Sequence, residues 1–163
     1  NRVLFADRLE QGLAQATRHG WNLAVMFLDL NCFKRVNDEH GHAIGDAVLQ
    51  EVGRRLQGMT RADDTISRHG GDEFLCLLIE TGAEQDLVQI AEKFIREVQL
   101  PCDLGESSPE VSLNMSVSIG ISVFPKDGAT AGELTASADA AMYRAKRDGS
   151  GYAFASDLRP SPA

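Results

Sequence analysis

Three acidic residues lie at positions where a carboxylate could bind a metal ion or transfer a proton. Asp29 lies near the end of the apolar run Leu23–Leu30, and Asp72 and Glu73 follow the paired glycines of His69–Gly71. A carboxylate that points inward from an apolar strand is costly unless it is paired or bound to a metal. If the two segments are neighbouring strands, Asp29 and Asp72 converge. Two carboxylates and a backbone carbonyl suit Mg²⁺, and a pair of such ions can activate a hydroxyl and stabilise a leaving phosphate.

The same residues also have a purely structural interpretation. Asp29 could cap a loop, and the acidic pair could decorate a turn. Other site chemistries have weaker support, because the sequence contains neither a G-x-x-x-x-G-K-[ST] phosphate loop nor a G-x-S-x-G hydrolase motif. His40 and His42 have no obvious further zinc ligands, so a zinc site there has weak support.

Hydrophobic periodicity and turn residues predict the elements that position these carboxylates. Apolar runs predict buried strands over 23–30 and 74–79, and the glycine pair predicts a hairpin between 65–68 and 74–79. Helices are predicted over 2–19, 32–39, 44–59, 83–99 and 130–147, and further strands over 111–124 and 152–154. This mixture predicts an α/β (α+β) fold, with a partly antiparallel sheet covered by helices.

Composition narrows the class of protein. The chain has 163 residues, of which 43% are hydrophobic, and this fits a single domain with a real core. Its formal net charge of -8 argues against nucleic-acid binding, while metal ions can screen the charge for a small phosphate ligand. No apolar run reaches the roughly 18 residues of a membrane span, so we expect no membrane contact by this segment.

The cysteines and the two ends of the chain give further expectations. Cys32, Cys76 and Cys102 are odd in number and form no CxxC pair, which indicates a reduced, cytoplasmic compartment. Cys32 and Cys76 lie in apolar runs and are predicted to pack in the core. We expect one domain over residues 1–155, taken from a longer protein, and a linker-like tail over 156–163.

Four motifs, in the right order, resemble the GGDEF family of diguanylate cyclase domains. Arg68–Phe74 reads R-H-G-G-D-E-F and resembles the R-x-G-G-D-E-F signature. Phe27–Asp46 is similar to F-x-D-x-D-x-F-K-x-x-N-D-x-x-G-H-x-x-G-D, Ser118–Ile121 to S-I-G-I, and Ala138–Lys146 to A-D-x-A-(L/M)-Y-x-A-K. The resemblance extends from Asn1-Arg2 to about Phe154, which is nearly the whole chain.

The resemblance implies a fold like the palm of nucleotidyl cyclases, related to the ferredoxin-like fold, with a mainly antiparallel central sheet flanked by helices. It also implies that two GTP molecules are condensed into cyclic di-GMP and two pyrophosphates. Two Mg²⁺ or Mn²⁺ ions per active site would be held by Asp29, the Leu30 carbonyl and Asp72. Glu73 would assist deprotonation of the attacking 3′-hydroxyl, or orient a water.

The resemblance further implies a substrate site made of Phe33, Lys34, Asn37, His42, Asp46 and Lys146. Phe33, Lys34 and Lys146 would lie by the phosphates. Asn37 and Asp46 would bind guanine, whose N1–H and N2–H₂ donors suit a carboxylate, whereas adenine lacks them. Because each site would hold one GTP, two domains must face each other, so a homodimer is expected. Asp46 and Lys146 could instead merely complement helix dipoles.

The R-x-x-D string Arg61–Asp64 stands where the family carries its product-inhibition site. Arg61 could bind guanine O6 and N7, and Asp64 could accept from the amino groups. The plain alternative is an exposed salt bridge worth about 0–1 kcal/mol.

The sequence departs from the family pattern at three places. Asn31 stands where Asp is usual, Ser150 stands where a basic residue is usual, and the preceding D-x-L-T-x-L segment is absent. Two alternatives to an active cyclase therefore stay open. One is a GTP-binding regulator of a fused domain, such as a cyclic di-GMP phosphodiesterase. The other is a cyclic di-GMP receptor that acts through Arg61 and Asp64.

Overall fold

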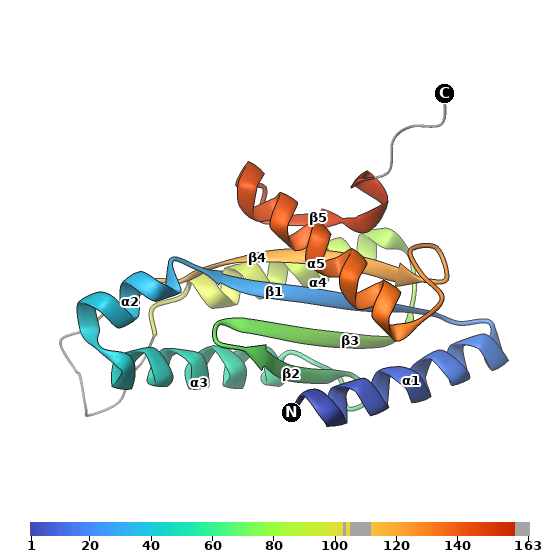
Figure 1. The fold of residues 1–163 in the computed structure, drawn as a ribbon, viewed down its shortest axis with the longest axis horizontal. Coiled ribbons are helices and arrows are strands. Elements are labelled where there is room, and N and C mark those ends of the chain that lie inside the picture. Colours follow the sequence, from blue (N-terminus) through green and yellow to red (C-terminus); the bar gives the residue numbers. More distant parts are fainter. Residues whose placement is uncertain (103, 105–111, 159–163) are drawn as a thin grey trace.

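A five-stranded sheet in the order β2-β3-β1-β4-β5 forms the centre of the computed structural model, which describes residues 1–102, 104 and 112–158 (Figure 1). The strands are β1 (Asn22–Asn31), β2 (Thr65–Gly70), β3 (Glu73–Thr81), β4 (Ser116–Phe124) and β5 (Tyr152–Phe154). The helices are α1 (Arg2–His19), α2 (Phe33–His40), α3 (His42–Gly58), α4 (Glu84–Gln99) and α5 (Ala131–Asp148), followed by the 3-10 helix η2 (Ala155–Leu158).

Strand β1 is the middle strand and pairs antiparallel with both β3 and β4. Strand β2 is antiparallel to β3, and the short β5 is parallel to β4. The predicted α+β fold with a mainly antiparallel sheet and flanking helices is therefore confirmed. The central position of β1 explains its nearly continuous apolar run, because both of its faces are buried.

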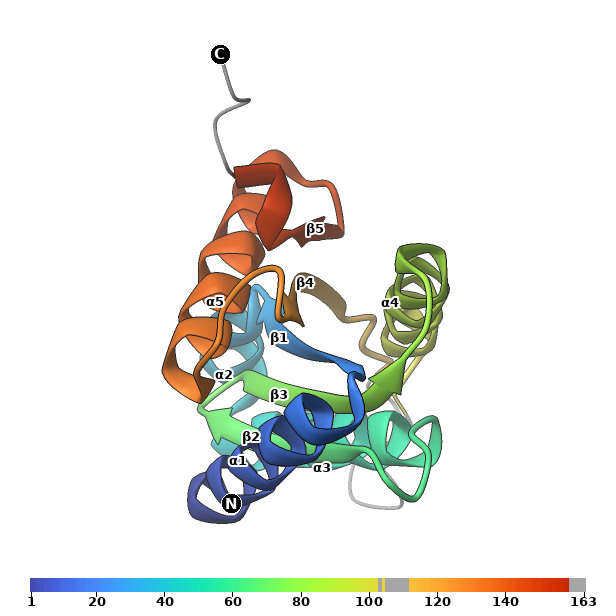
Figure 2. The ribbon, with the colours of Figure 1, turned by 90° about the vertical axis from the view of Figure 1, so that its right-hand side faces the viewer.

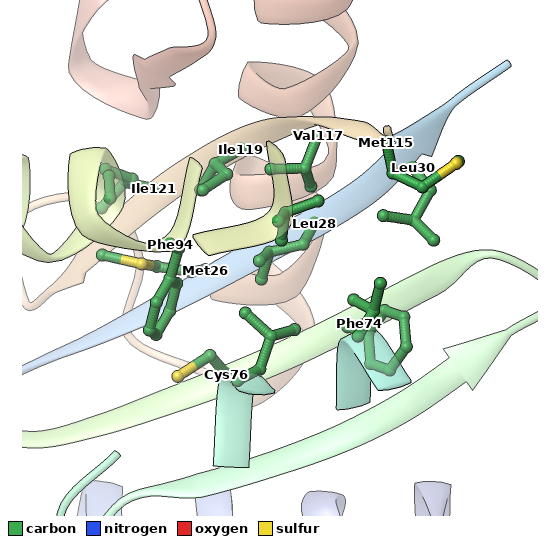
Figure 3. Close-up of a cluster of buried hydrophobic side chains, with 14 of the residues drawn as sticks. Met26, Leu28, Leu30, Phe74, Cys76, Phe94, Met115, Val117, Ile119 and Ile121 are labelled. Carbon is green, nitrogen blue, oxygen red and sulfur yellow. The ribbon is translucent and has the colours of Figure 1, made fainter. Parts of the chain in front are cut away.

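Alternate residues of β1 serve two different cores. Ala24, Met26, Leu28 and Leu30 pack in a large cluster with side chains of α3 and α4. Figure 3 draws part of this cluster, including Met26, Leu28, Leu30, Phe74, Cys76, Phe94, Met115, Val117, Ile119 and Ile121. The other series, Leu23, Val25 and Phe27, packs with α1 and α5, and Asp29 continues that series toward the end of the strand.

Helix α5 lies against β4 at unusually short range. A Cβ atom on Gly120 would lie 1.9 Å from the Ala138 carbonyl oxygen and 2.2 Å from the Met142 backbone nitrogen. Only glycine permits this approach, because those neighbours are backbone atoms that cannot turn aside. Figure 2 shows α5 and α4 on opposite sides of the sheet. The approach brings the last turn of α5 over the ends of the central strands.

Several predicted boundaries differ in detail. Strand β4 begins at Ser116, residues 112–115 form no strand, and residue 111 lies outside the described residues. The first residues of the predicted tail, 156–158, lie within η2, and residues 159–163 are outside the described part. The prediction that Cys32 packs in the core is wrong: it is exposed, in a left-handed conformation with φ 59° that turns the chain out of β1 into α2. Of the helices described, none has the length and apolar character needed to cross a membrane.

Candidate active site

The end of β1 meets the turn between β2 and β3. The register of the two strands places Asp29 opposite Glu73, and the Leu30 N–H donates to the Asp72 carbonyl at 3.1 Å. Gly70 pairs with Glu73, so Gly71 and Asp72 form the two-residue turn. Convergence of Asp29 and Asp72 was expected if their two strands are neighbours. The strands are neighbours, and Asp29, Asp72 and Glu73 lie together at one edge of the sheet.

Asp29 is a buried carboxylate with one oxygen satisfied and one not. Its side chain is 12% exposed, and its Oδ2 accepts a hydrogen bond from Lys146 Nζ at 2.9 Å. Its Oδ1 is buried with no hydrogen-bond partner. A buried, unpartnered carboxylate oxygen is expensive, and a cation at this position would satisfy it.

Burial and the nearby charge of Asp29 disfavour the charged forms of Asp72 and Glu73. Burial raises the pKa of Asp72, and the negative charge of Asp29 raises it further. Burial and the Asp29 charge likewise raise the pKa of Glu73, while nearby His69 partly opposes this shift. A divalent cation would remove the repulsion, since its charge favours ionised carboxylates.

The donor set fits magnesium or manganese better than a metal that needs a complete protein cage. Within the described ranges, no group of three or more His, Cys, Asp or Glu side chains is arranged to hold a metal. Mg²⁺ usually takes one or two carboxylates and fills its remaining positions with water and substrate phosphates. Asp29, Asp72 and the predicted Leu30 carbonyl match that sparse set.

Helix α2 starts directly after β1 and presents its N-terminus near the carboxylates. Its first residue, Phe33, is buried, whereas Lys34 is exposed and free to reach a ligand. The helix has no side-chain N-cap and no acidic residue in its first turn. Free N–H groups at a helix start attract phosphate, so this end suits the triphosphate role predicted for Phe33 and Lys34.

Asn37 and Asp46 are brought together by the close packing of α2 on α3. A Cβ on Gly45 would lie 1.8 Å from Asn37 Oδ1, so the Asn37 side chain rests directly on the backbone next to Asp46. Asp46 is exposed, and so is His42 at the start of α3. The two predicted guanine-binding residues thus share one surface, with the Asp46 carboxylate accessible to a base.

The Arg61–Asp64 pair lies toward the other end of β3. The Asp64 side chain is 3% exposed, and its two oxygens accept from the backbone N–H groups of Arg61 and Ile79, each at 3.1 Å. The Arg61 side chain is 65% exposed and donates to the Ile79 carbonyl at 2.8 Å. Asp64 therefore anchors the turn and presents Arg61, so the pair differs from the wholly exposed salt bridge of the alternative interpretation.

Two contacts were missed from the sequence. Asn31 donates to Ser116 at 2.9 Å and accepts from Ser118 at 3.0 Å, which ties the end of β1 to β4. The alternating serines of β4 were a usable signal, but the β1–β4 register was needed to pair them with Asn31. The second is the Lys146–Asp29 pair, because Lys146 was expected either to lie by the phosphates or to complement the helix dipole.

Comparison with known proteins places this geometry in a family. The model of the "Diguanylate cyclase, GGDEF domain" family matches residues 1–151. The chain is 46% identical over 155 residues to the bifunctional diguanylate cyclase/cyclic di-GMP phosphodiesterase MucR of Pseudomonas aeruginosa. That alignment covers 94% of this chain but only 22% of MucR, so the chain spans a small part of this relative.

Solved structures share the fold. The crystal structure of the GGDEF domain of TpbB from P. aeruginosa has a TM-score of 0.86 at 40% identity, covering 91% of this chain and 90% of that one. The GGDEF domain of DgcB from Caulobacter crescentus, solved in complex with cyclic di-GMP, has a TM-score of 0.84 at 27% identity. Coverage is 96% of this chain and 91% of the DgcB domain.

Proposed function

The chain belongs to the GGDEF family of diguanylate cyclase domains, and we propose that it condenses two GTP molecules into cyclic di-GMP and two pyrophosphates. The observation that carries the proposal is the convergence of Asp29, Asp72 and Glu73 at one edge of the sheet, with a buried Asp29 oxygen left unpartnered. This is an acidic site built to receive cations, beside a helix start that suits phosphate.

Asp29, Asp72 and the Leu30 carbonyl would hold two Mg²⁺ or Mn²⁺ ions. When bound, the ions supply the positive charge that favours the 3′-alkoxide and neutralises the phosphate oxygens. Glu73 lies in register with Asp29 and accepts the proton of the 3′-hydroxyl, or orients a water that accepts it.

The bond changes are those of a phosphoryl transfer. The 3′-oxygen of one GTP forms a bond to the α-phosphorus of the other, and the bond from that phosphorus to the β-phosphate oxygen breaks. Pyrophosphate leaves with the electron pair, and a second transfer closes the ring. Lys34, Lys146 and the backbone at Phe33 would orient the triphosphate, and His42 would lie at the border of the pocket.

Guanine recognition falls to Asn37 and Asp46. The Asp46 carboxylate accepts from guanine N1–H and N2–H₂, and these donors are missing in adenine. A site built around such donors rejects an analogue without them by about 10⁴-fold or more, because its own polar groups stay unpaired.

The reaction requires two copies of the domain. Each copy holds one GTP, and the two nucleotides react only when the sites face each other, so a homodimer is the active form. Fused regulatory domains of the longer protein would bring the two copies together.

The test is a product assay on the full-length protein and on a dimerised fragment, with GTP and Mg²⁺ or Mn²⁺. Cyclic di-GMP and pyrophosphate are the expected products, and Asp72→Ala should abolish both while leaving the circular dichroism spectrum unchanged. Glu10→Gln, which removes an exposed α1 carboxylate, is the matched control. Failure of the wild-type full-length protein to form either product contradicts the proposal.

A second candidate is a GTP-binding regulator of an attached domain. It is favoured by Asn31, whose amide is committed to Ser116 and Ser118 and adds no carboxylate to the site. MucR, a bifunctional diguanylate cyclase/cyclic di-GMP phosphodiesterase, fits such an arrangement. This candidate predicts GTP binding without turnover, together with GTP-dependent activity of the attached domain. A third candidate is a cyclic di-GMP receptor that acts through Arg61 and Asp64, and it predicts product binding that depends on Arg61.

A further inference from the structure

The last turn of α5 places the ammonium group of Lys146 beside the acidic site, where the proposed metal ions would bind. Lys146 Nζ lies 2.9 Å from Asp29 Oδ2, although the two residues are 117 positions apart in the chain. The hydrogen bond to Asp29 raises the pKa of Lys146, and the charges of Asp29 and Asp72 add to the effect, so the ammonium stays charged at neutral pH.

The neighbouring cations of α5 are directed elsewhere. Arg144 Nε lies 3.5 Å from Asp148, and Arg144 Nη1 donates to the Asp157 carbonyl. Arg147 Nε lies 3.2 Å from Asp148. Of these three cations, Lys146 is the one engaged with the acidic site.

We propose that Lys146 is an internal counter-ion, which holds Asp29 in the metal-free protein and gives way to divalent ions, moving onto the nucleotide phosphates as they bind. The inference rests on the proposed function, because it takes Asp29 and Asp72 as metal ligands. It adds a role for Lys146 before substrate arrives, whereas the proposed function uses this residue only in the GTP complex.

One ammonium group does not complete the site. Asp29 Oδ1 stays buried and without a partner even with Lys146 in place. The pKa of Asp72 also stays raised, by burial and by Asp29, although Lys146 partly opposes the shift. A divalent ion offers twice the charge and more than one ligand position, so it outcompetes the lysine when present.

Lys146 can leave without disturbing the core. Its side chain is 42% exposed, so the ammonium has a route to water. A lysine ammonium is a hydrated point charge on a flexible stem, and changing its rotamer requires no movement of α5. A triphosphate above the site would accept the released ammonium, whose positive charge it attracts.

This exchange couples metal binding to nucleotide binding. Without nucleotide, the metal must compete with Lys146 for Asp29. With nucleotide, the ammonium has a better place to go, so the metal binds more tightly. Because such coupling is reciprocal, metal also strengthens nucleotide binding beyond its direct contacts.

The test measures Mn²⁺ binding by electron paramagnetic resonance in the absence of nucleotide. Lys146→Met should bind Mn²⁺ about tenfold more tightly than wild type, because the competing charge is gone. Lys146→Arg keeps the charge and should stay close to wild type. Arg147→Met loses the same charge one residue away and should leave Mn²⁺ affinity unchanged. Adding a non-hydrolysable GTP analogue should tighten Mn²⁺ binding less in Lys146→Met than in wild type.

The outcomes separate the two proposals. If wild type and Lys146→Met both fail to bind Mn²⁺, with or without nucleotide, the proposed metal site is wrong. If wild type binds Mn²⁺ but Lys146→Met binds it equally or more weakly, the counter-ion role is wrong and the metal site stands. Should Lys146→Met not fold, Lys146→Gln carries the same comparison with a polar side chain.

Discussion

Asp29 on β1 and Glu73 on β3 occupy facing positions in adjacent antiparallel strands. This register fixes the distance between the proposed metal ligand and the proposed base through backbone hydrogen bonds, and leaves little of it to side-chain flexibility. Both residues lie on the sheet face that is covered by α1 and α5, and Lys146 belongs to α5. The pairing of β1 with β3 therefore aligns the proposed metal ligand Asp29 with the proposed base Glu73.

The site carries a cost in stability that a substitution should reveal. The pKa of Asp72 is higher in the folded protein than in the unfolded chain. The contribution of Asp72 to the free energy of unfolding is therefore fully present below its unfolded pKa and is lost as pH rises through its folded pKa. At neutral pH and without metal, Asp72→Asn should therefore raise the free energy of unfolding. The gain should stay below about 1 kcal/mol, because the residue is only half-buried.

Urea denaturation across the acid range checks this prediction. The stability difference between Asp72→Asn and wild type should shrink as pH falls, while cyclic di-GMP formation is lost at every pH. Glu10→Gln should leave both quantities unchanged. A variant less stable than wild type at neutral pH would show that Asp72 has a stabilising partner.

Guanine selectivity should depend on Asp46. Asp46→Asn replaces one of the two acceptor oxygens with an NH₂ donor and removes the negative charge that would face the guanine donors, so the ratio of kcat/KM for GTP to that for ATP should fall by about 100-fold or more. Asp46 is exposed, so the fold should not change. Asp38→Asn, an exposed carboxylate on α2, is the matched control. An unchanged ratio would remove Asp46 from the guanine site.

The support of Asn37 by Gly45 offers a steric test. In Gly45→Ala the new methyl group would collide with Asn37 Oδ1, and KM for GTP should rise about tenfold to 100-fold as Asn37 is displaced. Gly53→Ala on the same helix is the control, since its nearest neighbour would be Phe74 Cε1 at 3.5 Å. That variant should keep wild-type KM and gain up to about 1 kcal/mol of stability. Equal KM values in both variants would contradict the role of Asn37.

Product binding should be separable from substrate binding. Arg61 is exposed and lies toward the opposite end of β3 from Glu73, so Arg61→Ala should weaken cyclic di-GMP binding by about 10- to 100-fold and leave GTP affinity unchanged. Isothermal titration calorimetry measures both, with Arg18→Ala as the control. Asp64 is unsuitable for this test, because its buried oxygens hold the turn. Unaltered cyclic di-GMP binding would exclude the receptor hypothesis at this pair.

The approach of α5 to β4 should be intolerant of any side chain. Gly120→Ala should lower the free energy of unfolding by about 3 kcal/mol or more, because backbone atoms of Ala138 and Met142 cannot move aside without shifting the helix. The control is Gly132→Ala in α5. Its new methyl group would meet nothing within 4 Å, so the change should be nearly neutral. Urea denaturation of the two variants provides the comparison, and equal stabilities would refute the packing argument.

Local patterns carried most of the element predictions. The apolar run of β1, the glycine pair of the hairpin and the helical periodicity all depend on neighbours in sequence, so these elements could be predicted. Cys32 shows the limit of such patterns. Its apolar surroundings suggested burial, but a single left-handed residue turns the chain and exposes the thiol.

Long-range pairing could not be derived from the residues alone. The meeting of Asp29 and Asp72 depended on whether their strands are neighbours, and only the strand order β2-β3-β1 answers that question. The links from Asn31 to Ser116 and Ser118 needed the register between β1 and β4. The family resemblance supplied the roles, while the contacts with Lys146 and the serines came from the structure.

The separation of Asp29 and Lys146 by 117 positions in the chain bears on how the protein is made. During synthesis, all three carboxylates have been translated once β3 is made, whereas Lys146 follows only with α5. A chain that ends before α5 therefore carries the three carboxylates without the lysine that neutralises part of their charge. Maturation of the domain is finished by its last long helix.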